Sequence, residues 1–336
     1  MSARAPLLAV RDLRVGFPSA DGRVIEAVRG IDFAVADGAA VGVVGESGSG
    51  KSLSMLALIR LIAPPGRITG GVVAFGAEDL IALDEKRLRR IRGRDIAMVF
   101  QDPQSSLNPS LSVGRQIADV LRAHTNLSAA QSQLAAAEAL ERVGISPDKR
   151  HAYPHELSGG MRQRVMIAMA IACRPRLLIA DEPTTALDVT VQAQIVALLA
   201  RLRRELGLSI IFISHNLQLV SEIVDRVIVM YGGRIVEDGP VETLFRHPRH
   251  PYTTLLKACV PNLDDPPGPL TAIEGAPPHI GHMPAGCPFA PRCPRAIARC
   301  AAEMPPLVAQ DAGAQDAGAL DAGALGDHRV ACWNPA

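Results

Sequence analysis

The segment GESGSGKS, residues 45–52, constrains the fold more than any other part of this 336-residue sequence. It fits the pattern G-x-x-x-x-G-K-S, with Gly45, Gly50, Lys51 and Ser52 at the fixed positions. The apolar run AVGVV precedes it and the helical run LSMLALIRL follows it. Because glycines let successive N–H groups turn toward phosphates, the segment predicts a phosphate-binding loop between a buried strand and a helix.

Each position of this loop has an expected role toward ATP and Mg²⁺. The Lys51 ammonium is expected to reach the β- and γ-phosphates, and the Ser52 hydroxyl to hold magnesium. Ser47 and Gly48 lie in the same turn and are expected to line the phosphates.

The remaining chain predicts an α/β fold. The first forty residues alternate in period two and indicate antiparallel strands. RLLIADEP, LSIIFISHN and DRVIVMYGGRIVEDG are strand-like and are separated by helical segments, so we expect a largely parallel sheet. We assign a core to residues 1–245, with a helical subdomain at about 103–170, and a loop-rich extension to residues 246–336. The repeat DAGAQDAGALDAGAL, residues 311–325, has low complexity.

Composition narrows the class of protein. No apolar run reaches the roughly 18 residues of a spanning helix, and the apolar N-terminal stretch is too short for a signal peptide. A net charge of +1 does not favour nucleic acid as a partner. We therefore expect a soluble protein of the cytoplasm that docks on a membrane component, with reduced cysteines.

Two further segments have the chemistry of a nucleotide site. In LSGGM, Ser158 can cap a helix, and Gly159 and Gly160 let an anion approach the backbone. In LLIADE, Asp181 ends an apolar strand, where a carboxylate can complete a magnesium shell. Glu182 follows directly and could act as the general base toward water, a role that contributes about 10²–10⁴-fold.

The order and spacing of these motifs resemble those of ATP-binding cassette (ABC) ATPases. The resemblance implies a P-loop core with a mixed sheet, an antiparallel β subdomain and an inserted helical subdomain. It also implies that Ser158, Gly159 and Gly160 close over the nucleotide of a facing subunit, so that hydrolysis needs a dimer. Because a long coiled coil, a basic stripe between residues 51 and 158 and a second cassette are not evident in the sequence, non-transport members acting on nucleic acid or ribosomes are the less favoured alternative.

The same resemblance assigns the other site residues one by one. Gln101 in VFQDP matches the glutamine that senses magnesium and the membrane subunit, and Asp188 in TALD matches the aspartate at the dimer seam. His215 in ISHN matches the histidine that contacts the γ-phosphate. It is followed by Asn216 where an aspartate is usual. Phe17 lies where an aromatic ring commonly stacks on adenine, although a strand phenylalanine is equally often a core residue.

Three segments resemble the ATPases of di- and oligopeptide importers: QDPQSSLNPSLSVGRQI, YPHELSGGMRQRV and HPRHPYT. The resemblance implies a second ATPase subunit, usually a paralogue, two permeases and an indirect link to a solute-binding protein, with the chain peripheral on the cytoplasmic face of the inner membrane. A related importer of a nickel chelate, glutathione or cell-wall peptides is the alternative. HPRHPYT is expected to pack the extension on the core rather than to act in catalysis.

Four cysteines of the extension form a possible ligand set. Cys287, Cys293, Cys300 and Cys332 are separated by five, six and thirty-one residues. No pair has the tight C-x-x-C spacing that structural zinc favours, and wider loops suit a bulkier cluster. The resemblance to importer ATPases also points to a 4Fe-4S cluster. Zinc and unliganded thiols remain alternatives.

Overall fold

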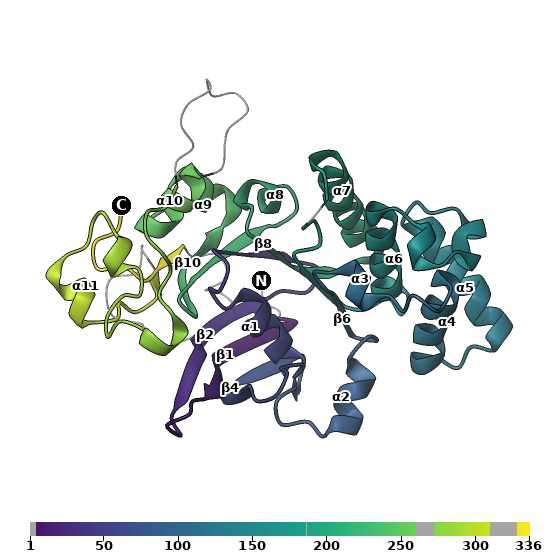
Figure 1. Ribbon diagram of the computed structural model, residues 1–336, viewed down its shortest axis with the longest axis horizontal. Coiled ribbons are helices and arrows are strands. Elements are labelled where there is room, and N and C mark those ends of the chain that lie inside the picture. The colour runs from purple at the N-terminus through teal and green to yellow at the C-terminus, as the bar shows by residue number, and fades with distance from the viewer. Residues whose placement is uncertain (1–4, 186, 260–271, 310–327) are drawn as a thin grey trace. The chain divides into compact units, whose positions relative to one another are not determined.

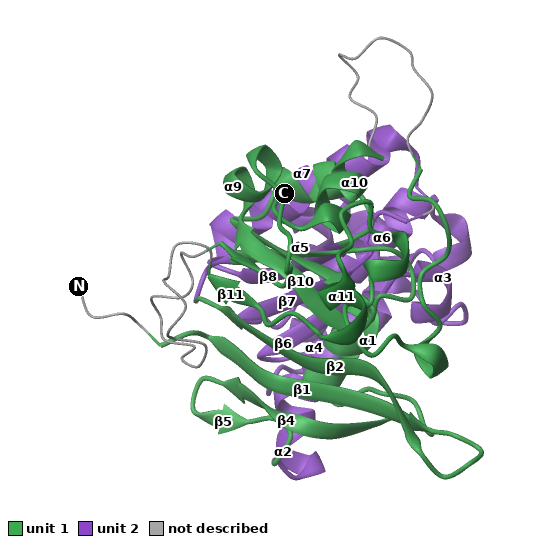
Figure 2. Cartoon of the chain, turned by 90° about the vertical axis from the view of Figure 1, so that its left-hand side faces the viewer, with its two compact units in different colours: residues 1–36, 40–82, 214–336 green, residues 37–39, 83–213 purple. Residues whose placement is uncertain are grey.

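The computed structural model describes residues 5–185, 187–259, 272–309 and 328–336 (Figure 1). The chain divides into two compact units (Figure 2). The first unit comprises residues 1–36, 40–82 and 214–336, and the second comprises residues 37–39 and 83–213. The boundary that we assigned at residues 245/246 therefore lies inside the first unit. The repeat at 311–325 lies outside the described residues.

The first unit contains an antiparallel sheet in the order β2-β1-β4-β5. Its strands are β1 (Leu8–Pro18), β2 (Val24–Val35), β4 (Arg67–Phe75) and β5 (Glu78–Asp79). Val10, Leu13 and Val15 of β1 are fully buried, while Arg11 and Asp12 are exposed. The strand β1 pairs antiparallel with β2 and with β4, which confirms the antiparallel strands predicted for the first forty residues.

A second set of strands in the same unit carries the phosphate loop. The strand β3 (Ala40–Val44) is buried at every residue and pairs in parallel with β9 (Arg226–Tyr231). The antiparallel strands β10 (Arg234–Pro240), β12 (Arg329–Val330) and β11 (Val308–Ala309) continue from β9. Helix α1 (Lys51–Leu58) begins at the end of the loop that follows β3, and α8 (Leu217–Ser221) contacts β3.

The second unit combines three parallel strands with a group of helices (Figure 1). Strands β6 (Ile96–Val99), β7 (Leu177–Asp181) and β8 (Ser209–Ser214) pair in parallel, and β7 and β8 are buried throughout. The predicted helical stretch at about 103–170 holds α3 to α6, with α4, α5 and α6 packed on one another. The helices of this unit are α2 (Glu85–Ile91), α3 (Pro103–Ser106), α4 (Val113–His124), α5 (Ala129–Arg142), α6 (Gly159–Ile171) and α7 (Val189–Leu206), with 3₁₀ turns at Pro147–His151 and Pro154–Glu156.

The extension belongs to the first unit because buried charges bind it to β10. The Glu237 carboxylate, which is 0 % exposed, accepts hydrogen bonds from the backbone N–H groups of Arg249 and His250. Arg329 next to the C-terminus forms an ion pair with the buried Asp238. These contacts satisfy carboxylates that would otherwise be costly to bury. Helix α9 (Val241–Arg246) leads into the extension, which contains α10 (Pro251–Ala258), α11 (Ala298–Ala302) and 3₁₀ turns at Ile280–His282 and Ala290–Arg292.

No helix in the described part of the chain has the length and apolar character needed to cross a bilayer.

Candidate nucleotide site

The phosphate loop has the predicted strand–loop–helix context. Gly50 caps α1 with a φ of 99°, so the loop turns in the left-handed region just before the helix. Gly45 has a φ of 150°, and a Cβ atom there would collide with the carbonyl oxygen of Met230. Only glycine fits both positions without strain. The loop therefore leads directly into the N-terminus of an eight-residue helix, where backbone N–H groups can face an anion.

The Lys51 side chain is buried against the backbone of this loop. The residue is 4 % exposed, and its Nζ atom donates hydrogen bonds to the carbonyl oxygens of Gly45 at 2.7 Å and Glu46 at 2.9 Å. Ser52 is half-buried, while Ser47 and Gly48 are exposed. The loop thus holds its ammonium group at its centre and presents its tip to solvent.

In the second unit the structure brings together two of the predicted catalytic residues. Asp181 is the buried last residue of β7, and Glu182 follows with a φ of 45°. The Gln101 Nε2 atom donates to Glu182 Oε2 at 3.2 Å, and Thr185 Oγ1 donates to the same oxygen at 2.8 Å. A left-handed conformation is unusual for glutamate and aims the carboxylate away from the course of the strand. Two donors therefore fix the proposed general base.

The LSGGM segment, residues 157–161 and called the signature turn below, and the seam residue Asp188 also lie together in the second unit. Ser158 caps α6 by accepting a hydrogen bond from Met161 N at 3.3 Å, as predicted for a helix start. Asp188 caps α7 by accepting from Val191 N at 2.9 Å. A Cβ atom at Gly160 would lie 2.8 Å from Val191 Cγ1, so this glycine lets the two helix starts approach closely. Ser158 and Gly159 remain exposed.

Two other predicted residues lie in the first unit. His215 follows β8 and is exposed, and the next residue, Asn216, caps α8 by accepting from the backbone N–H groups of Gln218 and Leu219. An aspartate, which is usual at this position, would cap in the same way, so asparagine keeps the turn and removes only a charge. Phe17 in β1 is half-buried, and its ring would meet a Cβ atom placed on Gly66.

Three residues beside the phosphate loop were not predicted from the sequence. The Tyr252 hydroxyl accepts a hydrogen bond from the Glu46 backbone N–H at 2.7 Å. Arg292 forms an ion pair with the Glu46 carboxylate at 2.7 Å and donates to the Tyr231 hydroxyl at 3.0 Å. The packing role predicted for residues 247–253 is confirmed, because Tyr252 is fully buried. Arg292 gave no sequence signal, because it is 246 residues away from Glu46.

The tail cysteines lie near one another. Burial, with added repulsion from the Cys300 and Cys332 thiols, raises the pKa of Cys287 to about 11. Burial also raises the pKa of Cys332, with added repulsion from Cys293 and Cys300. Among the described residues, however, no group of three or more His, Cys, Asp or Glu is arranged to hold a metal ion. The predicted metal-binding tail is therefore not supported by the structure.

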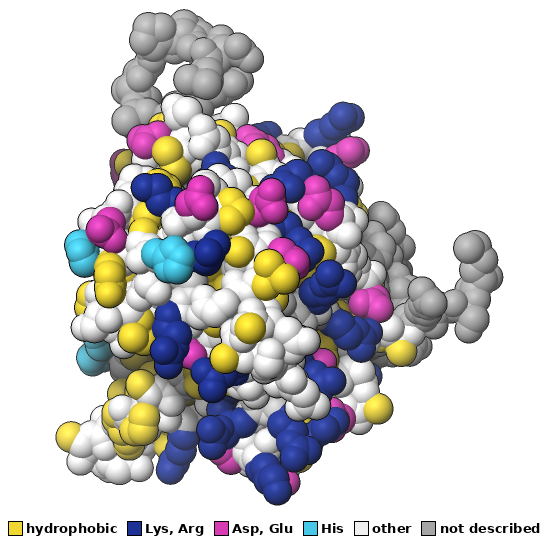
Figure 3. Space-filling view, turned by 90° about the vertical axis from the view of Figure 1, so that its right-hand side faces the viewer, with side chains coloured by type: hydrophobic (Ala, Val, Ile, Leu, Met, Phe, Trp, Pro, Cys, Tyr) yellow, Lys and Arg dark blue, Asp and Glu magenta, His cyan; other side chains and the backbone are white. Residues whose placement is uncertain are grey.

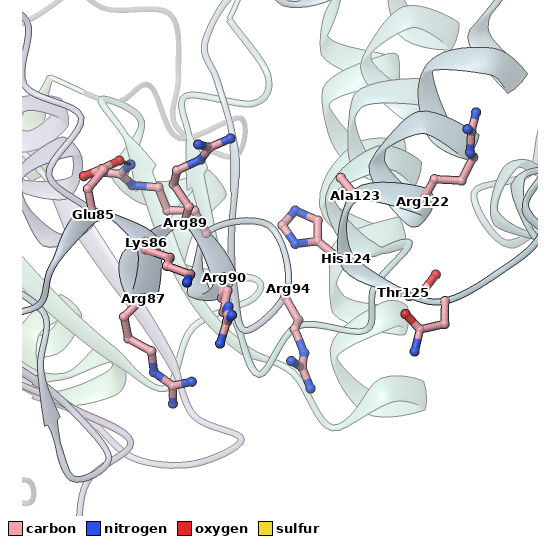
Figure 4. A pocket seen from close by; sticks show the side chains of 12 residues that line it. Glu85, Lys86, Arg87, Arg89, Arg90, Arg94, Arg122, Ala123, His124 and Thr125 are labelled. Atoms are coloured by element: carbon pink, nitrogen blue, oxygen red, sulfur yellow. Dashed lines mark hydrogen bonds and ion pairs between the residues drawn. The ribbon is translucent and has the colours of Figure 1, made fainter.

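One cleft in the second unit is lined by none of the predicted nucleotide residues. It has a volume of about 1000 Å³ and lies between α2, the turn before β6 and the end of α4 (Figure 4). Basic side chains also gather toward the lower part of the face shown in Figure 3. The expectation of no basic stripe between residues 51 and 158 is therefore wrong. The cleft is lined by Lys86, Arg87, Arg89, Arg90, Arg92, Arg94 and Arg122.

Sequence comparisons agree with this geometry. Residues 28–185 match the family described as ABC transporter, and residues 236–300 match the oligopeptide/dipeptide transporter C-terminal region. A Brucella melitensis protein named as a putative peptide import ATP-binding protein is 49 % identical over 321 residues, covering 91 % of this chain and 95 % of that protein. A Brucella abortus protein with the same description is 52 % identical over 303 residues, covering 90 % and 91 %.

Solved structures agree as well. A dimeric ATP-binding cassette in a post-hydrolysis state with ADP and Pi has a TM-score of 0.63 and 26 % identity, covering 70 % of this chain and 98 % of that one. The protein cbiO1 from Clostridium perfringens, part of the ABC transporter complex cbiONQ, also has a TM-score of 0.63, with 28 % identity and coverage of 72 % and 92 %. Fold and motifs together define an ABC ATPase. The chain belongs to the ATP-binding proteins of ABC transporters that carry the oligopeptide/dipeptide C-terminal region.

Proposed function

We propose that this ATPase powers the import of di- and oligopeptides through a membrane ABC transporter. The phosphate loop carries the proposal, since Gly50 in the left-handed region and Lys51 at the start of α1 form a ready anion cradle. The peptide class is supported by the C-terminal region at residues 236–300 and by the names of the relatives.

Each residue of the chain then has a defined task toward ATP. Lys51 exchanges its bonds with the loop carbonyls for bonds with the β- and γ-phosphates, and Phe17 stacks on adenine. Glu182, fixed by Gln101 and Thr185, orients and deprotonates the attacking water. His215 contacts the γ-phosphate.

The oxygen atoms of Ser52, Asp181 and Gln101 suit Mg²⁺. They are a hydroxyl, a carboxylate and an amide oxygen, the hard ligands that this ion prefers. When bound, magnesium neutralises developing charge on the phosphates. The Gln101 amide can serve both groups, because its nitrogen donates to Glu182 and its oxygen stays an acceptor.

Hydrolysis takes place at a composite site of two subunits. Ser158, Gly159 and Gly160, with the seam residue Asp188, close over the nucleotide held by the facing subunit. The exposure of Ser158 and Gly159 supports this assignment, as does the dimeric structure of the similar cassette bound to ADP and Pi. We further propose that the facing subunit is a paralogue. In this proposal two permeases bind the pair on the cytoplasmic face of the inner membrane, a solute-binding protein delivers the peptide, and nucleic acid is not a partner.

We also propose that Cys287, Cys293, Cys300 and Cys332 hold a 4Fe-4S cluster, with zinc as the alternative. Burial and repulsion from the neighbouring thiols raise the pKa values of Cys287, Cys293 and Cys332, which supports proximity, and a cationic centre would lower these values again. Backbone N–H groups also face the sulfur atoms, as at Asn334 N to Cys332 Sγ at 3.4 Å. The test is anaerobic purification with visible absorbance and with iron and zinc assays. A brown protein with about four irons is expected from a 4Fe-4S centre, whereas a colourless zinc protein contradicts it.

The import function is tested in proteoliposomes that contain the chain, its paralogue and both permeases. ATP hydrolysis should rise when the solute-binding protein is added with a tri- or tetrapeptide, and the peptide should accumulate inside. A rise with a nickel chelate or glutathione, and none with peptides, would replace the peptide class by the alternative one. The Lys51→Ala variant is the control and should abolish both signals.

A further inference from the structure

The C-terminal extension reaches into the phosphate loop through a single side chain. Arg292 ends the 3₁₀ turn Ala290–Arg292, and its side chain is only 5 % exposed. Its guanidinium clasps the Glu46 carboxylate with two parallel bonds, from Nη1 to Oε2 at 2.7 Å and from Nη2 to Oε1 at 3.1 Å. Glu46 is the second residue of the phosphate loop. A bidentate pair of this kind fixes orientation as well as distance.

All five N–H donors of this guanidinium have an acceptor. Besides the two bonds to Glu46, Nη1 donates to the Tyr231 hydroxyl at 3.0 Å. Nε donates to the carbonyl oxygen of Glu274 at 2.8 Å, and Nη2 donates to that of Ile273 at 3.1 Å. An arginine offers five donors in a rigid fork, and here none is left for another partner. The side chain is therefore a fixed strut and not a mobile surface group.

Glu46 is held at three points, two of them from the extension. Arg292 holds its carboxylate, and the Tyr252 hydroxyl accepts from its backbone N–H at 2.7 Å. The third is its carbonyl oxygen, which accepts from Lys51 Nζ at 2.9 Å. The rings of Tyr231, Tyr252 and Phe289 pack on one another with centroids 4.6–5.3 Å apart, which makes this support rigid.

We infer that Arg292 is a positioning residue for the ATPase, through which the C-terminal extension sets the conformation of the phosphate loop and hence the affinity for ATP. This inference rests on the proposal that residues 45–52 bind the phosphates of ATP. Without the clasp, Glu46 and the carbonyl group that Lys51 contacts would sample several positions, and binding would have to order them. A loop that is already ordered binds ATP more tightly.

The test measures binding of a fluorescent ATP analogue to the full chain. Arg292→Gln should raise the dissociation constant about tenfold, the scale of one charge-assisted hydrogen bond. Arg292→Lys, which keeps the charge and one bond, should restore part of the affinity. Arg299→Gln is the matched control: Arg299 lies in the same extension but pairs with Glu303 on the surface, so its loss should leave binding unchanged.

A double-mutant cycle separates the clasp from a general loss of structure. Glu46→Gln should weaken binding about as much as Arg292→Gln, and the double variant should be no weaker than the worse single variant. Hydrogen exchange of the amides of residues 45–50 should be faster in Arg292→Gln and unchanged in Arg299→Gln. If Arg292→Gln does not fold, Arg292→Lys and Glu46→Gln complete the test.

The two proposals fail in different ways. If Lys51→Ala loses ATP while folded Arg292→Gln binds it like the wild type, the inference about Arg292 is overturned and the phosphate loop stands. Additive effects of the two single variants would overturn it as well. If Lys51→Ala itself binds ATP normally, the phosphate site has been placed wrongly.

Discussion

The phosphate loop and the signature turn are both glycine-rich helix starts, but the fold treats them differently. Lys51 is buried in its loop, and the neighbouring Glu46 is held by Arg292 and Tyr252. Ser158 and Gly159 are exposed, and the Ser158 side chain caps its own helix. The first segment is organised by its own chain, whereas the second leaves its anion-binding groups open to a companion. This difference is what a composite site requires.

The largest expected effect is on the rate of ATP hydrolysis, in a variant whose phosphate loop is unchanged. Glu182→Gln should lower ATP hydrolysis by the assembled transporter by about 10²–10⁴-fold, because the amide cannot take a proton from water. ATP binding should persist, since Lys51 and the loop are unchanged. Hydrolysis is measured as phosphate release and binding with the fluorescent analogue. Wild-type phosphate release by the variant would remove Glu182 from the role of base.

A smaller effect is expected from a substitution in the exposed signature turn. Gly159→Gln should lower hydrolysis by the assembly by about tenfold or more, because the side chain fills the surface that a facing nucleotide must approach. The lone chain should bind ATP as before and unfold at an unchanged temperature, since a Cβ atom at Gly159 meets only Leu187 at an ordinary 3.6 Å.

Gly159→Ala is the matched control and should cost less hydrolysis than Gly159→Gln. The two substitutions differ only in how far the new side chain projects from α6. Loss of ATP binding by the lone chain would mean that the signature turn serves its own nucleotide, and the contrast between the two segments would disappear.

The smallest effect concerns the support beneath the phosphate loop. Burial lowers the pKa of His250 from 6.5 to about 4, and its Nδ1 atom accepts from Tyr252 N at 3.1 Å. The unfolded chain therefore takes up a proton below pH 6.5 that the folded chain refuses until about pH 4. Stability is present in full above pH 6.5 and falls as the pH drops, by about 2 kcal/mol at pH 5.

Urea unfolding at pH 7.5 and pH 5 measures this loss. His250→Asn keeps an acceptor for Tyr252 N and removes the titration, so its stability should depend less on pH by about the same 2 kcal/mol. Equal pH dependence in the variant and the wild type would show that other groups cause the loss. Arg115→Gln, on the surface of α4, is a suitable control.

Local sequence determined much of this protein, because short-range physics decides those features. The glycines of residues 45–50, the apolar run of β3 and the cap at Ser158 all act within a few residues, and they appear where the sequence predicts them. The cap at Asp188 is equally local but was not predicted. The family followed from the same motifs and their order. Most of the basic residues of the cleft lie in EKRLRRIRGR, residues 85–94, but we did not predict a basic surface from this segment.

Tertiary structure alone decided how the phosphate loop is supported. Glu46 occupies a variable position of the motif, and Arg292 follows a proline in an irregular tail. The sequence around either residue therefore does not predict the contact between them. The pair exists because buried charges on β10 hold the extension against the core, which closes a chain separation of 246 residues. Hydrophobic periodicity and capping motifs report only on contacts within a few residues, so they cannot predict a pair so far apart in the chain. Burial and charge pairing bring these two residues together only once the chain has folded.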